Sequence, residues 1–68
     1  VEHHELAAAI EQAVEQLPGD QRTAFILSEY EDWSSREIAA VIGGSEKSVE
    51  MHLYRARASL REKLQKFL

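Results

Sequence analysis

The side chains best suited to chemistry lie in a polar stretch over residues 47–57, and they suit contact with a nucleic acid. The guanidinium fork of Arg55 can donate two hydrogen bonds to a guanine edge, and Met51 and the ring of Tyr54 can contact a thymine methyl group. On a helical wheel these residues lie outside the apolar stripe of Val49 and Leu53. The other residues outside that stripe are Lys47, Ser48 and His52. We therefore expect a helix with one side for a core and another for a major groove.

Other residue types that support catalysis or metal binding lack a suitable arrangement. The adjacent His3 and His4 point to different helix faces, and no carboxylate completes a ligand set with them or with His52. Several acids occur without a nucleophile or enough chain for a cleft, so we interpret them as a solvated face. They are Glu11, Glu15, Glu29, Glu31 and Asp32. We interpret Trp33 as a packing residue. The sequence predicts no enzymatic activity, no metal and no cofactor.

A short helix, a turn and a longer helix must position the polar stretch. Two residue pairs mark the start of the short helix over residues 35–42: the capping-box pair Ser34 and Glu37, and the hydrophobic-staple pair Trp33 and Ile38. Gly43 and Gly44 end this helix, because glycine accepts a left-handed backbone, and Ser45 caps a helix over residues 46–66. This order predicts a helix-turn-helix.

Two further helices are expected ahead of this unit. Apolar residues three and four apart predict a helix over residues 3–16; they are Leu6, Ile10, Ala13, Val14 and Leu17. Pro18 ends that helix and suits the first position of the next, over residues 18–31. The expected buried side of this second helix consists of Ala24, Phe25, Leu27 and Tyr30. The fold class is therefore all-α, with four helices.

Length and charge limit the function further. The chain has 68 residues and no cysteine, so we expect one domain over residues 1–68, without disulfides. No apolar run approaches the roughly 18 residues of a membrane span, and we expect a soluble, cytoplasmic protein. The net charge of −4 argues against a DNA partner, but residues 1–44 carry −7 and residues 45–68 carry +3. The basic end can therefore face phosphate. Because the chain begins with Val1, we expect a fragment of a longer protein.

The apolar residues at the C-terminal end of the chain also need a surface on which to pack. We expect a tail of Leu64, Phe67 and Leu68 to pack on Leu6 and Ile10 of the first helix, because such a tail is too hydrophobic for a free terminus.

Three motifs in this order resemble a known family. They are residues 17–22 (LPGDQR), residues 33–39 (WSSREIA) followed by Ile42-Gly43, and residues 48–57 (SVEMHLYRAR). Together they resemble region 4 of bacterial sigma-70-type factors, in particular the extracytoplasmic-function (ECF) group, and the resemblance covers roughly residues 14–66.

The resemblance implies a promoter-binding domain that recognises the −35 element and docks on the flap of the RNA polymerase β subunit. By position, Met51, Tyr54 and Arg55 match the family's base-facing residues. Residues near the DNA backbone are implied at Lys47, Ser48, His52 and Arg57, and the start of the short helix, at Ser35 and Arg36, offers amides to phosphate. An anti-sigma factor is a further expected partner, and the domain is expected to be monomeric.

This chain departs from the family pattern in ways that weaken DNA contact. Glu50 and His52 stand where basic residues are common, Ser28 stands where arginine is frequent, and Gly44 replaces an apolar residue. Each basic side chain that is absent removes up to one phosphate contact. We therefore predict weak DNA binding by the isolated domain, with tethering to polymerase supplying its effective concentration.

Two alternatives stay open at this point. Residues 34–39 and 45–50 also resemble the DNA-binding domain of LuxR-type regulators, although Leu17-Pro18 and Arg55-Ala56-Arg57 favour the sigma resemblance. The acidic first three helices also suit a sigma-like module that mainly binds an anti-sigma factor or polymerase.

Overall fold

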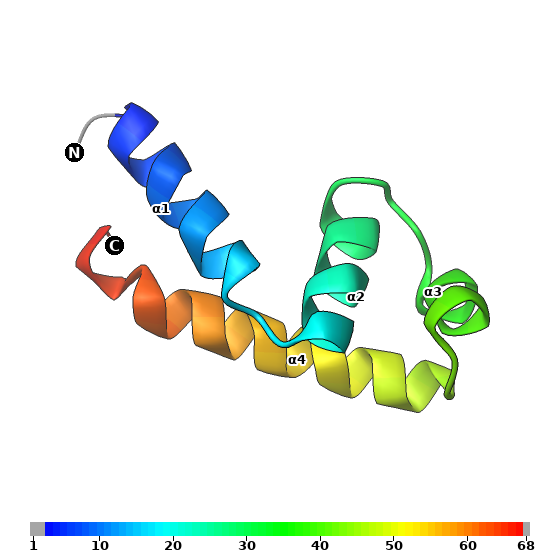
Figure 1. Cartoon of the computed structure of the whole chain (residues 1–68). Coiled ribbons are helices and arrows are strands. Elements are labelled where there is room, and N and C mark those ends of the chain that lie inside the picture. The colour runs from blue at the N-terminus through cyan, green and yellow to red at the C-terminus, as the bar shows by residue number, and fades with distance from the viewer. Residues whose placement is uncertain (1–2, 68) are drawn as a thin grey trace.

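The structure, a computed structural model, describes residues 3–67. They form four α-helices and a short 3₁₀ turn: α1 (His3–Glu15), α2 (Gly19–Glu29), α3 (Ser35–Ile42), α4 (Glu46–Lys63) and η1 (Gln65–Phe67). No strand occurs within the described residues, and the predicted all-α fold is confirmed. The long helix α4 runs along one side of the molecule, and α1, α2 and α3 follow one another from its C-terminal to its N-terminal end (Figure 1).

Two clusters of buried apolar side chains lie along α4. The HTH cluster joins α2 and α3 to the N-terminal half of α4; it consists of Ala24, Ile38, Val49 and Leu53. The α1 cluster joins α1 to the C-terminal half of α4; it consists of Ala13, Val14, Leu17, Ala56 and Leu60. Helix α2 contributes to both, because Phe25 and Ile26 pack against the α1 cluster and Leu27 against the HTH cluster. The predicted stripe on the last helix, with Val49 and Leu53, is therefore confirmed as core. The stripe on the first helix is confirmed except at Leu6, which is half-buried and belongs to neither cluster.

Four predicted helix bounds were wrong by one to three residues, the first of them the end of α1, which lies at Glu15 and not at residue 16. Pro18 is the N-cap of α2 and not its first residue, with an extended ψ of 152°. Helix α2 ends at Glu29, two residues early, because Asp32 adopts a left-handed φ of 59° in the loop to α3. Helix α4 ends at Lys63, after which Phe67 N–H donates to the Leu64 carbonyl over three residues. Such tighter bonds are common where a helix ends.

Tyr30 is not part of the buried side of α2, contrary to the expectation. It is 59% exposed, while Ala24 is fully buried. At about 100° per residue the two positions point roughly 120° apart around the axis, so Tyr30 does not share the face on which Ala24 is buried. Its ring instead meets the edge of Phe25, with ring centroids 6.3 Å apart. Phe25 and Leu27 are half-buried.

The start of α3 has the predicted capping box. The Glu37 amide donates to Ser34 Oγ at 3.1 Å, and the Ser34 amide donates to Glu37 Oε1 at 2.8 Å. These bonds satisfy amides that have no partner inside the helix, and such a cap contributes about 1 kcal/mol. Trp33 packs on the HTH cluster, which contains Ile38, so the hydrophobic staple is also present.

The turn between α3 and α4 requires glycine twice. Gly43 and Gly44 have φ values of 89° and 88°, which side chains with a Cβ rarely adopt. A Cβ at Gly44 would also lie 2.6 Å from the Ser48 hydroxyl oxygen. That hydroxyl completes a second capping box, since Ser45 N–H donates to Ser48 Oγ at 3.0 Å and Ser48 N–H donates to Ser45 Oγ at 3.1 Å. Gly44 therefore makes room for the cap of α4.

The C-terminal tail agrees in part with expectation. Leu64 and Ile10 both pack against the α1 cluster. Phe67 is half-buried and lines an open groove with Ala8, Ala9 and Gln12 of α1. Leu68 lies outside the described residues.

Candidate nucleic-acid interface

One side of α4 is exposed along the first three turns of the helix. We call it the reading face; it consists of Lys47, Glu50, Met51, Tyr54 and Arg55. These residues are three or four positions apart and therefore neighbours on a helix surface. Met51 is 41% exposed and Tyr54 69% exposed, whereas Val49 on the other side of α4 is fully buried. The predicted base-facing residues Met51, Tyr54 and Arg55 thus share one accessible surface.

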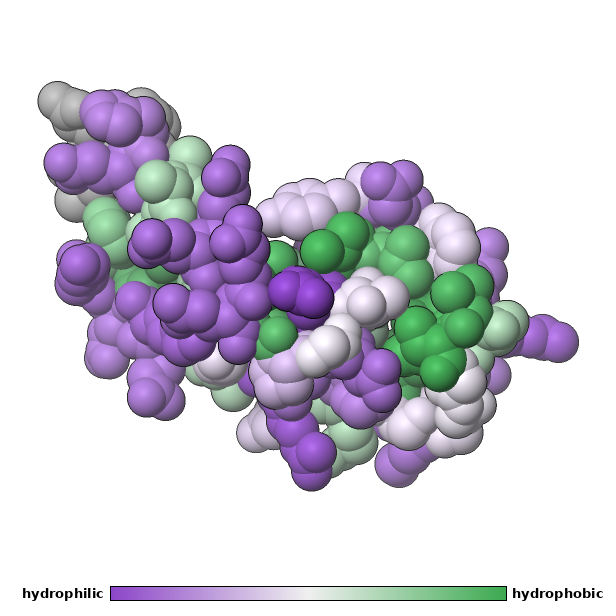
Figure 2. All heavy atoms as spheres, viewed as in Figure 1, coloured by the Kyte–Doolittle hydropathy of each residue, from purple (hydrophilic) through white to green (hydrophobic). Residues whose placement is uncertain are grey.

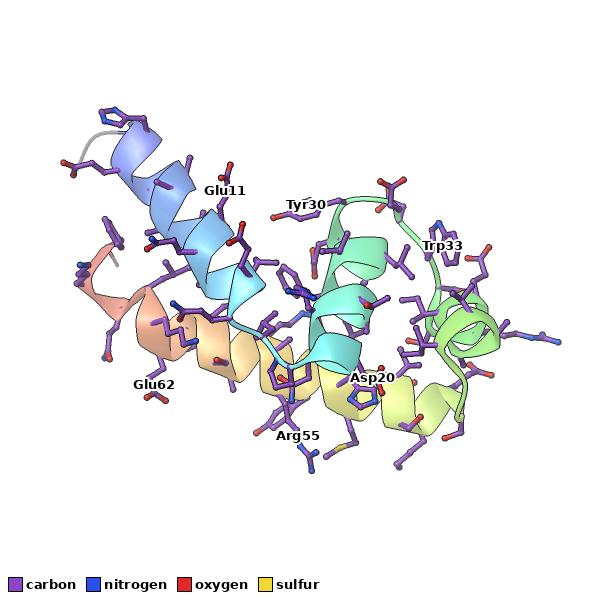
Figure 3. The ribbon with its side chains drawn as sticks, viewed as in Figure 1. Glu11, Asp20, Tyr30, Trp33, Arg55 and Glu62 are labelled. Carbon is purple, nitrogen blue, oxygen red and sulfur yellow. The ribbon has the colours of Figure 1, made fainter. Side chains whose placement is uncertain are left out.

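Arg55 is the most adaptable donor on the reading face. Its side chain points away from α1, α2 and α3 (Figure 3). No hydrogen bond or ion pair joins it to another residue in the described part of the chain. Its five N–H donors are therefore available for a guanine edge or a phosphate.

The other polar residues predicted on α4 have different surroundings. Ser48 Oγ donates to the Ser45 carbonyl oxygen at 2.8 Å, so contact with a phosphate would compete with the helix cap. His52 is half-buried, and Lys47 is exposed at the start of α4. Lys47 is therefore more accessible to a DNA backbone than His52 is.

Arg57 is turned toward α2 and away from the reading face. Its Nη2 lies 2.9 Å from Oε1 of Glu29, and the two side chains are 51% and 42% exposed. The pair bridges positions 28 residues apart, so no local spacing in the sequence could have indicated it. Arg57 retains further N–H donors, but Glu29 offsets its charge and holds it beside α2, which weakens any contact with a phosphate. Glu29 is an ion-pair partner here, and not only part of a solvated acidic face.

The start of α3 places Ser35 half-buried and Arg36 exposed. The amides at a helix start attract anions, but the Glu37 carboxylate already accepts from Ser34 N–H. That bond holds the pKa of Glu37 below its ordinary value of 4.5. A phosphate approaching this helix start would therefore meet an acceptor of like charge, with Arg36 as the available cation.

A separate surface on the opposite side of α4 is apolar with charged edges. Phe25, Leu60 and Leu64 line a shallow groove between α2 and α4, and its rim carries Glu29, Arg57 and Arg61. Figure 2 shows hydrophobic side chains gathered over α2 and α3, while hydrophilic ones cover most of α1. Protein partners use surfaces of this composition more often than nucleic acids do.

Metal binding has no support within the described residues. Among residues 3–67 no group of three or more histidine, aspartate or glutamate side chains is arranged to hold an ion. No helix in that range is both long enough and apolar enough to cross a bilayer.

A capped short helix, a glycine turn and a longer helix with an exposed polar face define a helix-turn-helix domain. The family model "Sigma-70, region 4" matches residues 7–60, and the chain belongs to this family. It is also 38% identical over 64 residues to the RNA polymerase sigma-H factor of Pseudomonas aeruginosa. That alignment covers 94% of this chain and 33% of the relative, so the chain spans about a third of that protein's length.

The family membership decides between earlier alternatives. It confirms the resemblance to sigma region 4 and sets aside the LuxR-type interpretation. The family consists of transcription initiation factors and not of enzymes, which confirms the prediction of a non-enzymatic function.

Proposed function

We propose that this domain recognises the −35 promoter element for a sigma factor of the ECF group and acts in the cytoplasm as part of RNA polymerase. The observation that carries the proposal is the reading face: five exposed residues on a helix whose other side is fixed in the HTH cluster. A helix held in this way can present base-contacting side chains to a major groove at a defined angle.

Base contact is assigned to Met51, Tyr54 and Arg55, and backbone contact to the polar residues around them. Lys47 and Arg36 are exposed and suit phosphate directly. Ser35, Ser48 and His52 are half-buried, and the charge of Arg57 is partly offset by Glu29. The small number of free cations supports weak DNA binding by the domain alone.

Binding to DNA is tested by selecting duplexes from a random library at low salt and titrating an enriched duplex by fluorescence anisotropy. Replacing Arg55 by alanine is expected to cost about 1–3 kcal/mol and to relax base preference at one position. Replacing Lys47 by alanine is expected to lower the slope of log affinity against log salt by about 0.9, equally for all sequences. Arg61→Ala and Lys66→Ala are the matched controls outside the reading face. Nanomolar affinity of the isolated chain at physiological salt would contradict the weak-binding part of the proposal.

The groove between α2 and α4 supports a second part of the proposal, docking on the polymerase β flap. Phe25, Leu60 and Leu64 give an apolar floor, and Arg57 and Arg61 give cations for an acidic partner segment. An anti-sigma factor would use the same kind of surface. The double variant Tyr54→Ala with Arg55→Ala distinguishes these tasks. If promoter activity survives in this variant, protein binding and not DNA reading is the main task.

The domain is proposed to act as a monomer on an asymmetric site. Sedimentation of the chain with its selected duplex tests this: one chain per duplex is expected, and two chains on a palindromic sequence would contradict it.

A further inference from the structure

Glu50 occupies the centre of the reading face. It lies one turn from Lys47 on one side and one turn from Tyr54 on the other, next to Met51. Its side chain is exposed, and it belongs to the first two turns of α4, the part of a recognition helix that meets base edges. A carboxylate at this position enters the groove together with the proposed base-facing residues.

Two acids near the helix-turn-helix have partners in the part of the chain that the structure describes, whereas Glu50 has none there. Glu29 pairs with Arg57, and Glu37 caps α3. Within the described residues, no hydrogen bond or ion pair joins Glu50 to another side chain. A carboxylate without a partner beside DNA phosphates is repelled unless a base supplies a donor.

The chemistry of base edges identifies that donor. A carboxylate only accepts hydrogen bonds, so it is repelled by the O6 and N7 acceptors of guanine and by O4 of thymine. Cytosine presents its N4 amino group with no acceptor of its own on the major-groove edge, whereas adenine places its own N7 acceptor next to its amino group. Cytosine is thus the base that a single carboxylate fits best.

We propose that Glu50 is a specificity residue that reads a cytosine by accepting a hydrogen bond from its N4 amino group. The proposal rests on the proposed DNA-reading function of this domain. Lys47, one turn away, offsets the repulsion between the Glu50 carboxylate and the phosphates. Glu50, which departs from the family pattern, then restricts the DNA sequences that the domain binds, in addition to weakening its overall affinity for DNA.

The test is selection from a randomised duplex library at low salt with this 68-residue chain and its variants. The unmodified chain is expected to prefer cytosine at one position by about fivefold or more over thymine. Glu50→Gln is expected to move that preference to adenine, because glutamine both donates to N7 and accepts from the N6 amino group. Glu50→Ala is expected to lose the preference, because duplexes without the cytosine are bound more tightly while the cytosine duplex, which loses its hydrogen bond, gains less affinity. The position is exposed, so circular dichroism should show the same helix content in every variant.

The matched control is Glu62→Gln. Glu62 is an exposed acid on the same helix, about three turns beyond Glu50; it projects from the same side of α4 as Arg55 but lies beyond the residues of the reading face (Figure 3). Its replacement removes the same charge and is expected to raise affinity slightly without changing any base preference.

Two results would overturn the inference, and the second would overturn the proposed function as well. If the unmodified chain enriches a defined motif and Glu50→Gln enriches the same motif, Glu50 is only a repulsive charge and DNA reading stands. If neither protein enriches any motif, the proposed function fails together with the inference.

Discussion

The two ends of α4 are packed differently, and the difference separates two kinds of surface. In the HTH cluster, Ala24, Ile38 and Val49 are completely buried. In the α1 cluster only Ala56 is completely buried, and open grooves run beside the cluster. A fully enclosed core fixes the orientation of the reading face, whereas an open one leaves apolar area for a second protein. The densely packed cluster therefore supports the proposed DNA-reading surface, and the less completely packed cluster lies beside the proposed protein-binding groove.

The largest effect is expected from emptying the HTH cluster. Ile38→Ala should destabilise the domain by about 3 kcal/mol, because it leaves a cavity between α2, α3 and α4. Urea unfolding followed by circular dichroism measures this loss. The control is Val41→Ala on the same helix, where the side chain is 61% exposed and a change within about 0.5 kcal/mol is expected. Equal losses for both variants would remove the distinction between core and surface in α3.

A smaller effect is expected in the α1 cluster. Leu60→Ala should cost about 2 kcal/mol, near the low end for a leucine, because the neighbouring groove lets side chains move toward the space. Hydrogen exchange should show lost protection in α1 and retained protection in α3 and the N-terminal half of α4. Uniform loss along the chain would show that the two clusters unfold as one unit, which would contradict the comparison.

The cap of α3 should contribute less than either cluster. Ser34→Ala removes the acceptor of the Glu37 amide and should cost about 1 kcal/mol. Thr23→Ala, an exposed hydroxyl within α2, is the control, and its thermal midpoint should hardly change. A cost for Ser34→Ala as small as that of Thr23→Ala would mean that the staple alone holds the helix start.

The other hydrogen bond of the α3 capping box, from Ser34 N–H to the Glu37 carboxylate, depends on pH. Glu37 accepts from Ser34 N–H only as a carboxylate, and its pKa in the folded protein lies below the ordinary 4.5. Its stabilisation is thus fully present above pH 4.5 and is lost as the pH falls through the lowered pKa. The stability of the unmodified chain minus that of Glu37→Gln should shrink over this acid range. Glu31→Gln, outside the cap, is the control, and a constant difference for Glu37→Gln would contradict the cap's role.

The ion pair between α2 and α4 should contribute least to stability. Glu29→Gln is expected to cost no more than about 0.5 kcal/mol, because both side chains are about half exposed to solvent. The same change frees Arg57, and the salt slope of DNA binding should then steepen by up to about 0.9. An unchanged slope would show that Arg57 belongs to the partner groove and not to the DNA side.

Local spacing predicted most of the fold because helices and caps are local structures. Ser34 with Glu37, and the stripes of α1 and α4, involve residues three or four apart. Sequence reasoning failed where the partner was distant or the turn geometry decided the outcome. It placed Tyr30 in the core, did not anticipate that Gly44 makes room for the Ser48 hydroxyl, and did not identify Ser48 as the second half of a cap.

The sequence by itself determined the four helices, the starts of α1, α3 and α4, and the residues that can share the reading face, because a helix sets the angle between successive side chains. Only the tertiary structure decided which side of α4 packs on α2 and which residues of these two helices form an ion pair. Arg57 and Arg55 are two residues apart, yet one faces Glu29 and the other faces solvent. That division follows from how α2 packs on α4, which depends on the combined shape of both clusters and not on any local pattern.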